Sequence, residues 1–142
     1  MAGVKIVIAF ICGFMIAQVV KLLIAVFKGE VQKEIADFKS AISFFCRSGG
    51  MPSGHAASFA AATICIGETA GFSSPVFALA ICTMVIVIYD AMNVRYVVGE
   101  QGKVLNKMID KPIKIAEGHT LLEVFVGLIL GGVIGFIFLL LF

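Results

Sequence analysis

Long apolar segments alternate with polar ones along the whole chain. Each apolar segment is close to the roughly 20 residues that an α-helix needs to cross a hydrocarbon core of about 30 Å. The pattern predicts an all-α integral membrane protein with about four transmembrane helices, at residues 4–27, 55–72, 76–94 and 120–142. We expect these helices to form a single membrane-embedded domain over residues 1–142.

Two further segments are too polar to cross the membrane. Between Glu30 and Cys46, apolar residues recur at helical spacing and charged residues occupy the opposite face. This spacing predicts an interfacial amphipathic helix, lying in the plane of the membrane surface. The segment from Arg95 to Gly118 is rich in lysine and contains the helix breaker Pro112, so we expect it to lie outside the membrane.

The last apolar segment carries glycines at a spacing of four residues. Gly127, Gly131 and Gly135 therefore share one face of the predicted helix. Small residues on one face let two helix backbones approach closely in a membrane. The seam is expected inside the bundle or, less favoured, at the contact of a homodimer.

Composition excludes several classes of protein. Hydrophobic residues make up 61% of the chain and charged residues 14%, whereas a soluble domain is about half apolar and about a quarter charged. A net charge of +2 gives no basic surface for a nucleic-acid partner. The four cysteines form no C-x-x-C pair, so we expect neither disulfides nor a metal cluster.

The distribution of basic residues predicts the topology. All lysines and arginines except Lys5 and Lys21 lie in residues 28–47 and 95–114, which four spans place on the same side. The turn between the second and third spans has no basic residue. The positive-inside rule then places the basic segments in the cytoplasm and both termini outside.

Both histidines lie at the start of a predicted helix on the basic side. His55 follows Gly50, Ser53 and Gly54, and His119 directly precedes the fourth span. Unpaired N–H groups at a helix N-terminus bind anions, and glycine lets backbone amides approach a phosphate closely. Ser53 can cap the helix and can also reach a bound phosphate.

Further polar residues are expected beside the two histidines. Arg47 and Arg95 lie on the basic side and can bind phosphate oxygens. Glu123 lies one helical turn after His119, where a carboxylate can orient the imidazole of a nucleophile. Lys21 interrupts the first span, and it either pairs with Asp90 or extends to the basic interface.

These residues carry a resemblance to a known family. The chain resembles the divergent small bacterial and plant branch of the type 2 phosphatidic acid phosphatase superfamily, which also includes the vanadium-dependent haloperoxidases. The matching stretches lie at residues 18–21, 49–55, 89–95, 99–101, 105–106 and 118–124. Superfamily members usually have about six spans, so a second copy of this chain would complete the bundle.

The resemblance implies a role for each matching residue. His119 corresponds to the nucleophile, with Glu123 in place of the usual aspartate, and His55 corresponds to the acid that protonates the leaving group. Ser53, Gly54 and Arg95 correspond to the phosphate ligands. Three more polar residues in the matching stretches are expected to support the site: Asp90, Asn93 and Gln101.

The sequence thus favours a membrane phosphatase that hydrolyses a phospholipid or isoprenoid phosphate through a phosphohistidine, without a metal or other cofactor. Its expected location is a bacterial inner membrane, among membrane lipids, with the active site facing the cytoplasm. The alternative is a non-enzymatic anion- or lipid-binding protein, such as a transporter subunit or scaffold with the same phosphate cradle. A weaker interpretation is a metal-dependent enzyme that uses Asp90, Glu100 and Asp110.

Overall fold

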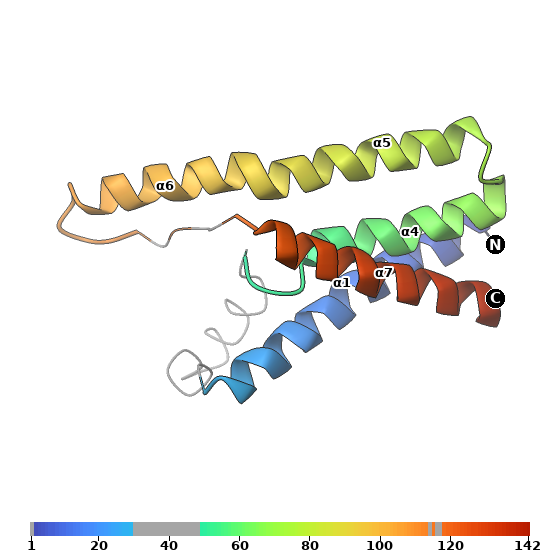
Figure 1. Ribbon diagram of the computed structural model, residues 1–142, viewed down its shortest axis with the longest axis horizontal. Helices are drawn as coiled ribbons and strands as arrows, with labels where there is room; N and C mark the ends of the chain where they lie inside the picture. Colours follow the sequence, from blue (N-terminus) through green and yellow to red (C-terminus); the bar gives the residue numbers. More distant parts are fainter. Residues whose placement is uncertain (1, 30–48, 114, 116–117) are drawn as a thin grey trace.

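The computed structural model describes residues 2–29, 49–113, 115 and 118–142, and within them every regular element is a helix. The predicted all-α class is therefore confirmed. The interfacial amphipathic helix predicted between Glu30 and Cys46 lies outside the described residues. The elements are α1 (Ala2–Phe27), α4 (Gly54–Ala70), α5 (Pro75–Tyr89), the π-helical turn η1 (Asp90–Val94), α6 (Arg95–Asn106) and α7 (Leu121–Leu141) (Figure 1).

Three helices of the described chain are long and apolar enough to cross a membrane. They are α1, the continuous helix Pro75–Asn106 and α7. The second predicted span, at residues 55–72, corresponds to α4, which has 17 residues and a length of about 26 Å at 1.5 Å per residue. The predicted count of four spans is therefore approximate.

The third helix does not end at Val94 as predicted. It passes through η1 into α6 and runs to Asn106, a total of 32 residues. Polarity alone does not end a helix, and Pro112 lies beyond this segment. At about 48 Å the continuous helix exceeds the membrane core, and α6 extends past the other helices in Figure 1.

Helix α4 lies between α1 and α7 and forms the centre of the bundle. Its alanines Ala56, Ala57 and Ala61 are fully buried. On the α7 side, a Cβ built at Gly135 would lie 3.1 Å from the Ala61 carbonyl oxygen. On the α1 side, a Cβ at Gly13 would lie 2.8 Å from the Ala57 carbonyl oxygen. The glycine seam predicted for α7 is thus an intramolecular contact.

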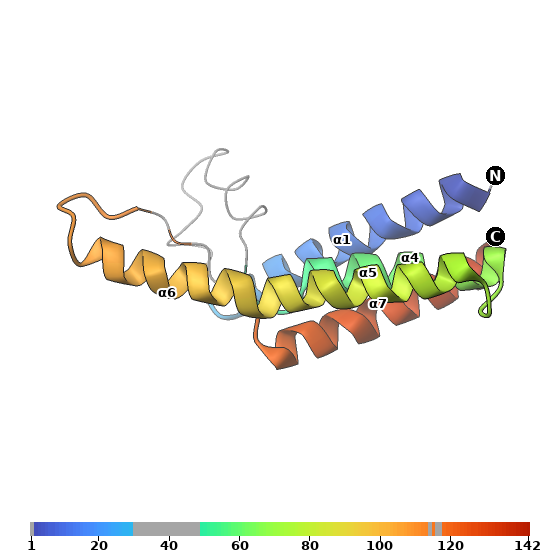
Figure 2. The same ribbon diagram turned by 90° about the horizontal axis from the view of Figure 1, so that it is seen from above.

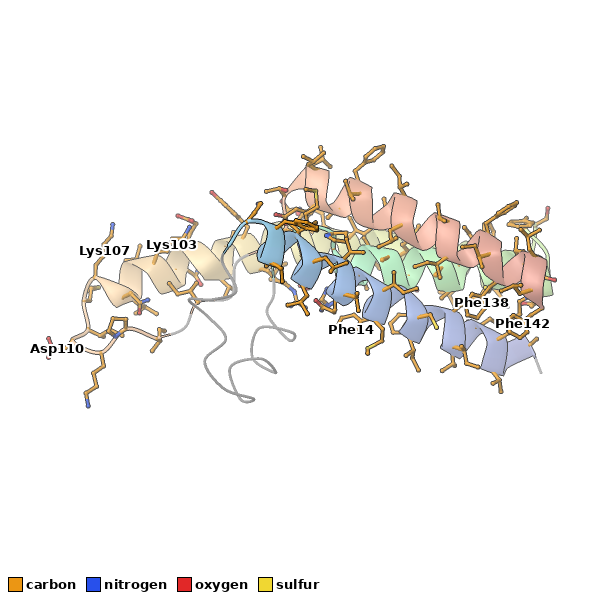
Figure 3. The ribbon with its side chains drawn as sticks, turned by 90° about the horizontal axis from the view of Figure 1, so that it is seen from below. Phe14, Lys103, Lys107, Asp110, Phe138 and Phe142 are labelled. Atoms are coloured by element: carbon orange, nitrogen blue, oxygen red, sulfur yellow. The ribbon has the colours of Figure 1, made fainter. Side chains whose placement is uncertain are left out.

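Both termini lie at one end of the bundle, and the start of α4 lies toward the other (Figures 1 and 2). Figure 3 shows the same polarity in the side chains, with Lys103, Lys107 and Asp110 far from Phe138 and Phe142. The charged residues of α6 and the loop after it therefore extend from the end of the bundle opposite the termini. Which end faces the cytoplasm stays a prediction.

Candidate active site

A glycine turn leads the chain into α4. Gly49 and Gly50 have φ angles of 93° and 81°, a region that favours glycine. After a cis Met51–Pro52 peptide, Ser53 caps α4, and its Oγ accepts the Ala56 N–H at 3.4 Å. Ser53 is fully buried. This turn aims the N-terminus of α4, with its partial positive charge, at the polar end of the bundle.

The backbone of His119 is anchored to the third helix. Its N–H donates to the Ala91 carbonyl at 2.9 Å. The preceding residue also fits closely, because a Cβ built at Gly118 would lie 2.7 Å from the Tyr96 nitrogen. Residues 118 and 119 are therefore held against η1 and the first turn of α6, although they are more than twenty residues away in sequence.

The His119 ring is oriented by Glu123, as the spacing of four residues predicts. Nδ1 lies 3.0 Å from Glu123 Oε2, and the His119 side chain is only 2% exposed. The same carboxylate oxygen accepts the Thr120 N–H, and Thr120 Oγ1 accepts the Glu123 N–H, which completes a capping box. A carboxylate acceptor places the proton on Nδ1, so Nε2 keeps its lone pair for attack.

The two histidines meet at the junction of α4 and α7. Their ring centroids lie 6.4 Å apart, with an angle of 67° between the ring planes. The Ser53 N–H donates to the Glu123 carbonyl at 3.0 Å and ties the glycine turn to the first turn of α7. Residues that lie more than sixty positions apart in sequence thus form one site.

Two cations lie around this pair of rings. The Lys21 side chain is buried and lies against Gly50, with its Cδ 3.7 Å from the position of a Cβ there. Arg95 Nε donates to Asp90 Oδ2 at 3.1 Å. Burial lowers the pKa of His119, the bond to Glu123 opposes this, and the charges of Lys21 and Arg95 lower it further.

Other predicted residues lie elsewhere. Arg47 is outside the described residues. Asn93 is exposed and donates to the Tyr89 carbonyl of its own helix, and Gln101 is exposed on α6. Within the described ranges, no three histidines, cysteines or acids are grouped to hold a metal ion. Asp90, Glu100 and Asp110 are accordingly not brought together.

Sequence reasoning missed several groups that position the site. The Ala91 carbonyl anchors His119, and no side-chain pattern encodes such a backbone contact. Gln18 is buried on α1 and its amide faces Gly54. Two signals pointed to Gln18, a polar residue within an apolar span and its place in the matching stretch 18–21, but only Lys21 of that stretch was given a role.

The fold and site define a helical membrane protein with paired histidines beside the buried N-terminus of α4. The chain belongs to the divergent PAP2 family, whose model matches residues 3–134. It is 31% identical over 106 residues to the uncharacterized membrane protein YuiD of Bacillus subtilis (strain 168), a match that covers 60% of this chain and 67% of that protein. No solved structure matches the chain.

Proposed function

We propose that this protein is a membrane phosphatase that hydrolyses a phospholipid or isoprenoid phosphate through a phosphohistidine on His119. The observation that carries the proposal is the 3.0 Å contact of His119 Nδ1 with Glu123, beside the His55 ring. An orienting carboxylate, a buried imidazole and a second imidazole are the parts that nucleophilic catalysis with general acid–base assistance requires. Membership of a PAP2-related family supports the same reaction class.

In the first step, the Nε2 lone pair of His119 attacks phosphorus and forms a P–N bond. The bond from phosphorus to the leaving oxygen breaks, and protonated His55 gives its proton to that oxygen. In the second step, water attacks the phosphohistidine, neutral His55 takes a proton from the water, and the P–N bond breaks. Inorganic phosphate leaves, and both rings return to their starting states.

Hydrogen-bond donors and cations held in fixed positions can stabilise the negative charge of the transferring phosphoryl group. The first amides of α4 and the Ser53 hydroxyl lie beside the histidines, and Lys21 and Arg95 add two positive charges within electrostatic range of His119. Fixed donors in a site shielded from water stabilise developing charge without reorganisation. The proposed chemistry therefore draws on this chain's own groups.

The proposed substrate reaches the site from the bilayer, because the α4 N-terminus belongs to a bundle with apolar outer faces. A lipid phosphate can place its headgroup at the glycine turn while its chain stays among membrane lipids. We place the site on the cytoplasmic face of a bacterial inner membrane, because the positive-inside rule assigns the basic segments that precede His55 and His119 in sequence to that side. A homodimer would cover the outer face of the long third helix.

Release of phosphate from purified protein in lipid nanodiscs tests the proposal, with phosphatidic acid, lysophosphatidic acid and an isoprenyl phosphate as substrates. We expect turnover with and without chelator, loss of turnover in His119→Asn, and retained vanadate binding in that variant. Glu123→Gln should leave a residual rate. The matched control Glu100→Gln, on the exposed face of α6, should keep the full rate.

The roles of the two histidines are separable by the leaving group. His55→Ala should lose about 10²–10⁴-fold with a simple ester, the usual contribution of a general acid. A substrate with a better leaving group should recover much of that loss in His55→Ala and none in His119→Asn. Full activity in His119→Asn would refute His119 as the nucleophile, whereas binding of phosphate by the wild type without turnover of any substrate would favour the non-enzymatic anion-binding alternative.

A further inference from the structure

Gln18 places an unsatisfied hydrogen-bond acceptor beside the candidate active site. The residue is 5% exposed, and its Oε1 is fully enclosed without a hydrogen-bond partner among the described residues. Buried polar atoms in native proteins are nearly always paired, because desolvation without a partner is unfavourable. An apolar side chain of similar size would avoid this cost, so the amide calls for a functional explanation.

The position of Gln18 ties it to the phosphate cradle. Its Nε2 lies 3.7 Å from where a Cβ would be on Gly54, the first residue of α4. Lys21 follows three residues later on the same face of α1 and lies against Gly50. Helix α1 therefore places the Gln18 amide beside the first residue of α4 and the aliphatic part of Lys21 against the glycine turn.

The chemistry of the acceptor specifies its ligand. Lys21, Arg95 and the first N–H groups of α4 are donors, and they suit the ionised oxygens of a phosphate. A carboxamide oxygen only accepts hydrogen bonds, and ionised phosphate oxygens do so too. A phosphate bound beside Gln18 can therefore pair with Oε1 only through an oxygen that carries a proton. Inorganic phosphate near neutral pH carries a P–OH group, and a phosphate monoester carries one in its monoanion, which forms below its second pKa of about 6. Sulfate carries none.

We propose that Gln18 is a specificity-determining residue that accepts a hydrogen bond from the P–OH group of a terminal phosphate. The amide would select a protonated tetrahedral oxyanion over a fully ionised one of the same shape, and over a phosphodiester. This inference rests on the proposed function, because it assigns the phosphate of the substrate to the same cradle. It adds a substrate class, terminal phosphates, to the reaction.

Binding of inorganic phosphate and of sulfate to the full chain in nanodiscs tests the proposal, by calorimetry at pH 7 and constant ionic strength. We expect Gln18→Met to lower the phosphate-to-sulfate affinity ratio about tenfold, the value of one such hydrogen bond. Lys21→Met, the same replacement on the same helix face, should weaken both anions and leave the ratio unchanged. Without anion, the melting temperature of Gln18→Met should equal or exceed that of the wild type.

The outcomes separate this inference from the proposed function. An equal loss of phosphate and sulfate binding in Gln18→Met would overturn it, because the amide would then serve the anion only as a donor. A changed preference between lysophosphatidic and phosphatidic acid with an unchanged phosphate-to-sulfate ratio would also overturn it, because the acceptor would then meet an alcohol. Failure of the wild type to bind either anion or release phosphate would refute the phosphatase itself.

Discussion

Replacing Gly127 with alanine should disturb both the bundle and the site, because this glycine lies four residues after Glu123 in the seam between α7 and α4. A Cβ built there would lie 2.5 Å from the Ser53 carbonyl oxygen and 3.0 Å from the Ala56 Cβ. The carbonyl belongs to the backbone and cannot rotate away. The two helices must therefore separate by roughly 0.5–1 Å at Ser53, the residue whose N–H donates to the Glu123 carbonyl. A clash of this size overpacks the contact between the helices.

The size of the effect follows from two general magnitudes. Overpacking costs about 1–3 kcal/mol of folding free energy, and displacement of a catalytic group by about 1 Å can reduce turnover roughly 10²-fold. The matched control is Gly132→Ala on the same helix, whose Cβ would lie 4.0 Å from Ile64 Cδ1. The change from glycine to alanine raises helix propensity equally in both variants, so a difference in their melting temperatures measures the effect of the clash alone.

Thermal melting in nanodiscs and phosphate release from a lipid phosphate measure the two effects. We expect Gly127→Ala to melt below Gly132→Ala and to lose one to two orders of magnitude in turnover, as estimated from the displacement. Equal melting temperatures for the two variants would refute the close approach of α4 and α7. A lower melting temperature with unchanged turnover would refute the coupling of the seam to the site.

Two more predictions concern protonation and topology. Burial lowers the pKa of His119, so the neutral nucleophile should persist below the ordinary value of 6.5. With a good leaving group, which does not need protonated His55, kcat/KM should fall only as pH drops through the lowered pKa of His119, and a decline that begins above pH 6.5 would contradict this. In a chain without native cysteines, an impermeant reagent applied to intact cells should label Ser73→Cys and not Lys103→Cys, and the reverse pattern would invert the topology.

The long apolar helices could be predicted closely from the sequence. Helices α1 and α7 begin and end within a few residues of the predicted spans, because long apolar runs with polar ends have one stable form in a membrane. The favoured position of the glycine seam, inside the bundle, was also predicted, but α4 as its partner was not. The helical continuation beyond Val94 was not, because α6 is amphipathic and its sequence is equally compatible with a polar connection.

The candidate site could be predicted where its contacts are local. The His119–Glu123 contact follows from a spacing of four residues. The hydrogen bond from the His119 N–H to the Ala91 carbonyl could not be predicted, because it depends on which backbone carbonyl of a distant helix is free to accept it. The amino-acid type at position 91 carries no information about this. Lys21 shows the same limit, since sequence leaves two environments open and only the packing of α1 against the glycine turn places its side chain.

The π-helical turn η1 changes the angular phase of the third helix. Arg95 N–H bonds back to the Asp90 carbonyl, five residues earlier, and the two side chains pair across the same turn. One added residue rotates every side chain beyond it by about 100° relative to an uninterrupted α-helix. A chain one residue shorter here would turn Tyr96 and the surface that receives Gly118 toward a different neighbour. The π-helical turn therefore sets the rotation of α6 about its axis so that the surface around Tyr96 faces the loop that carries Gly118 and His119.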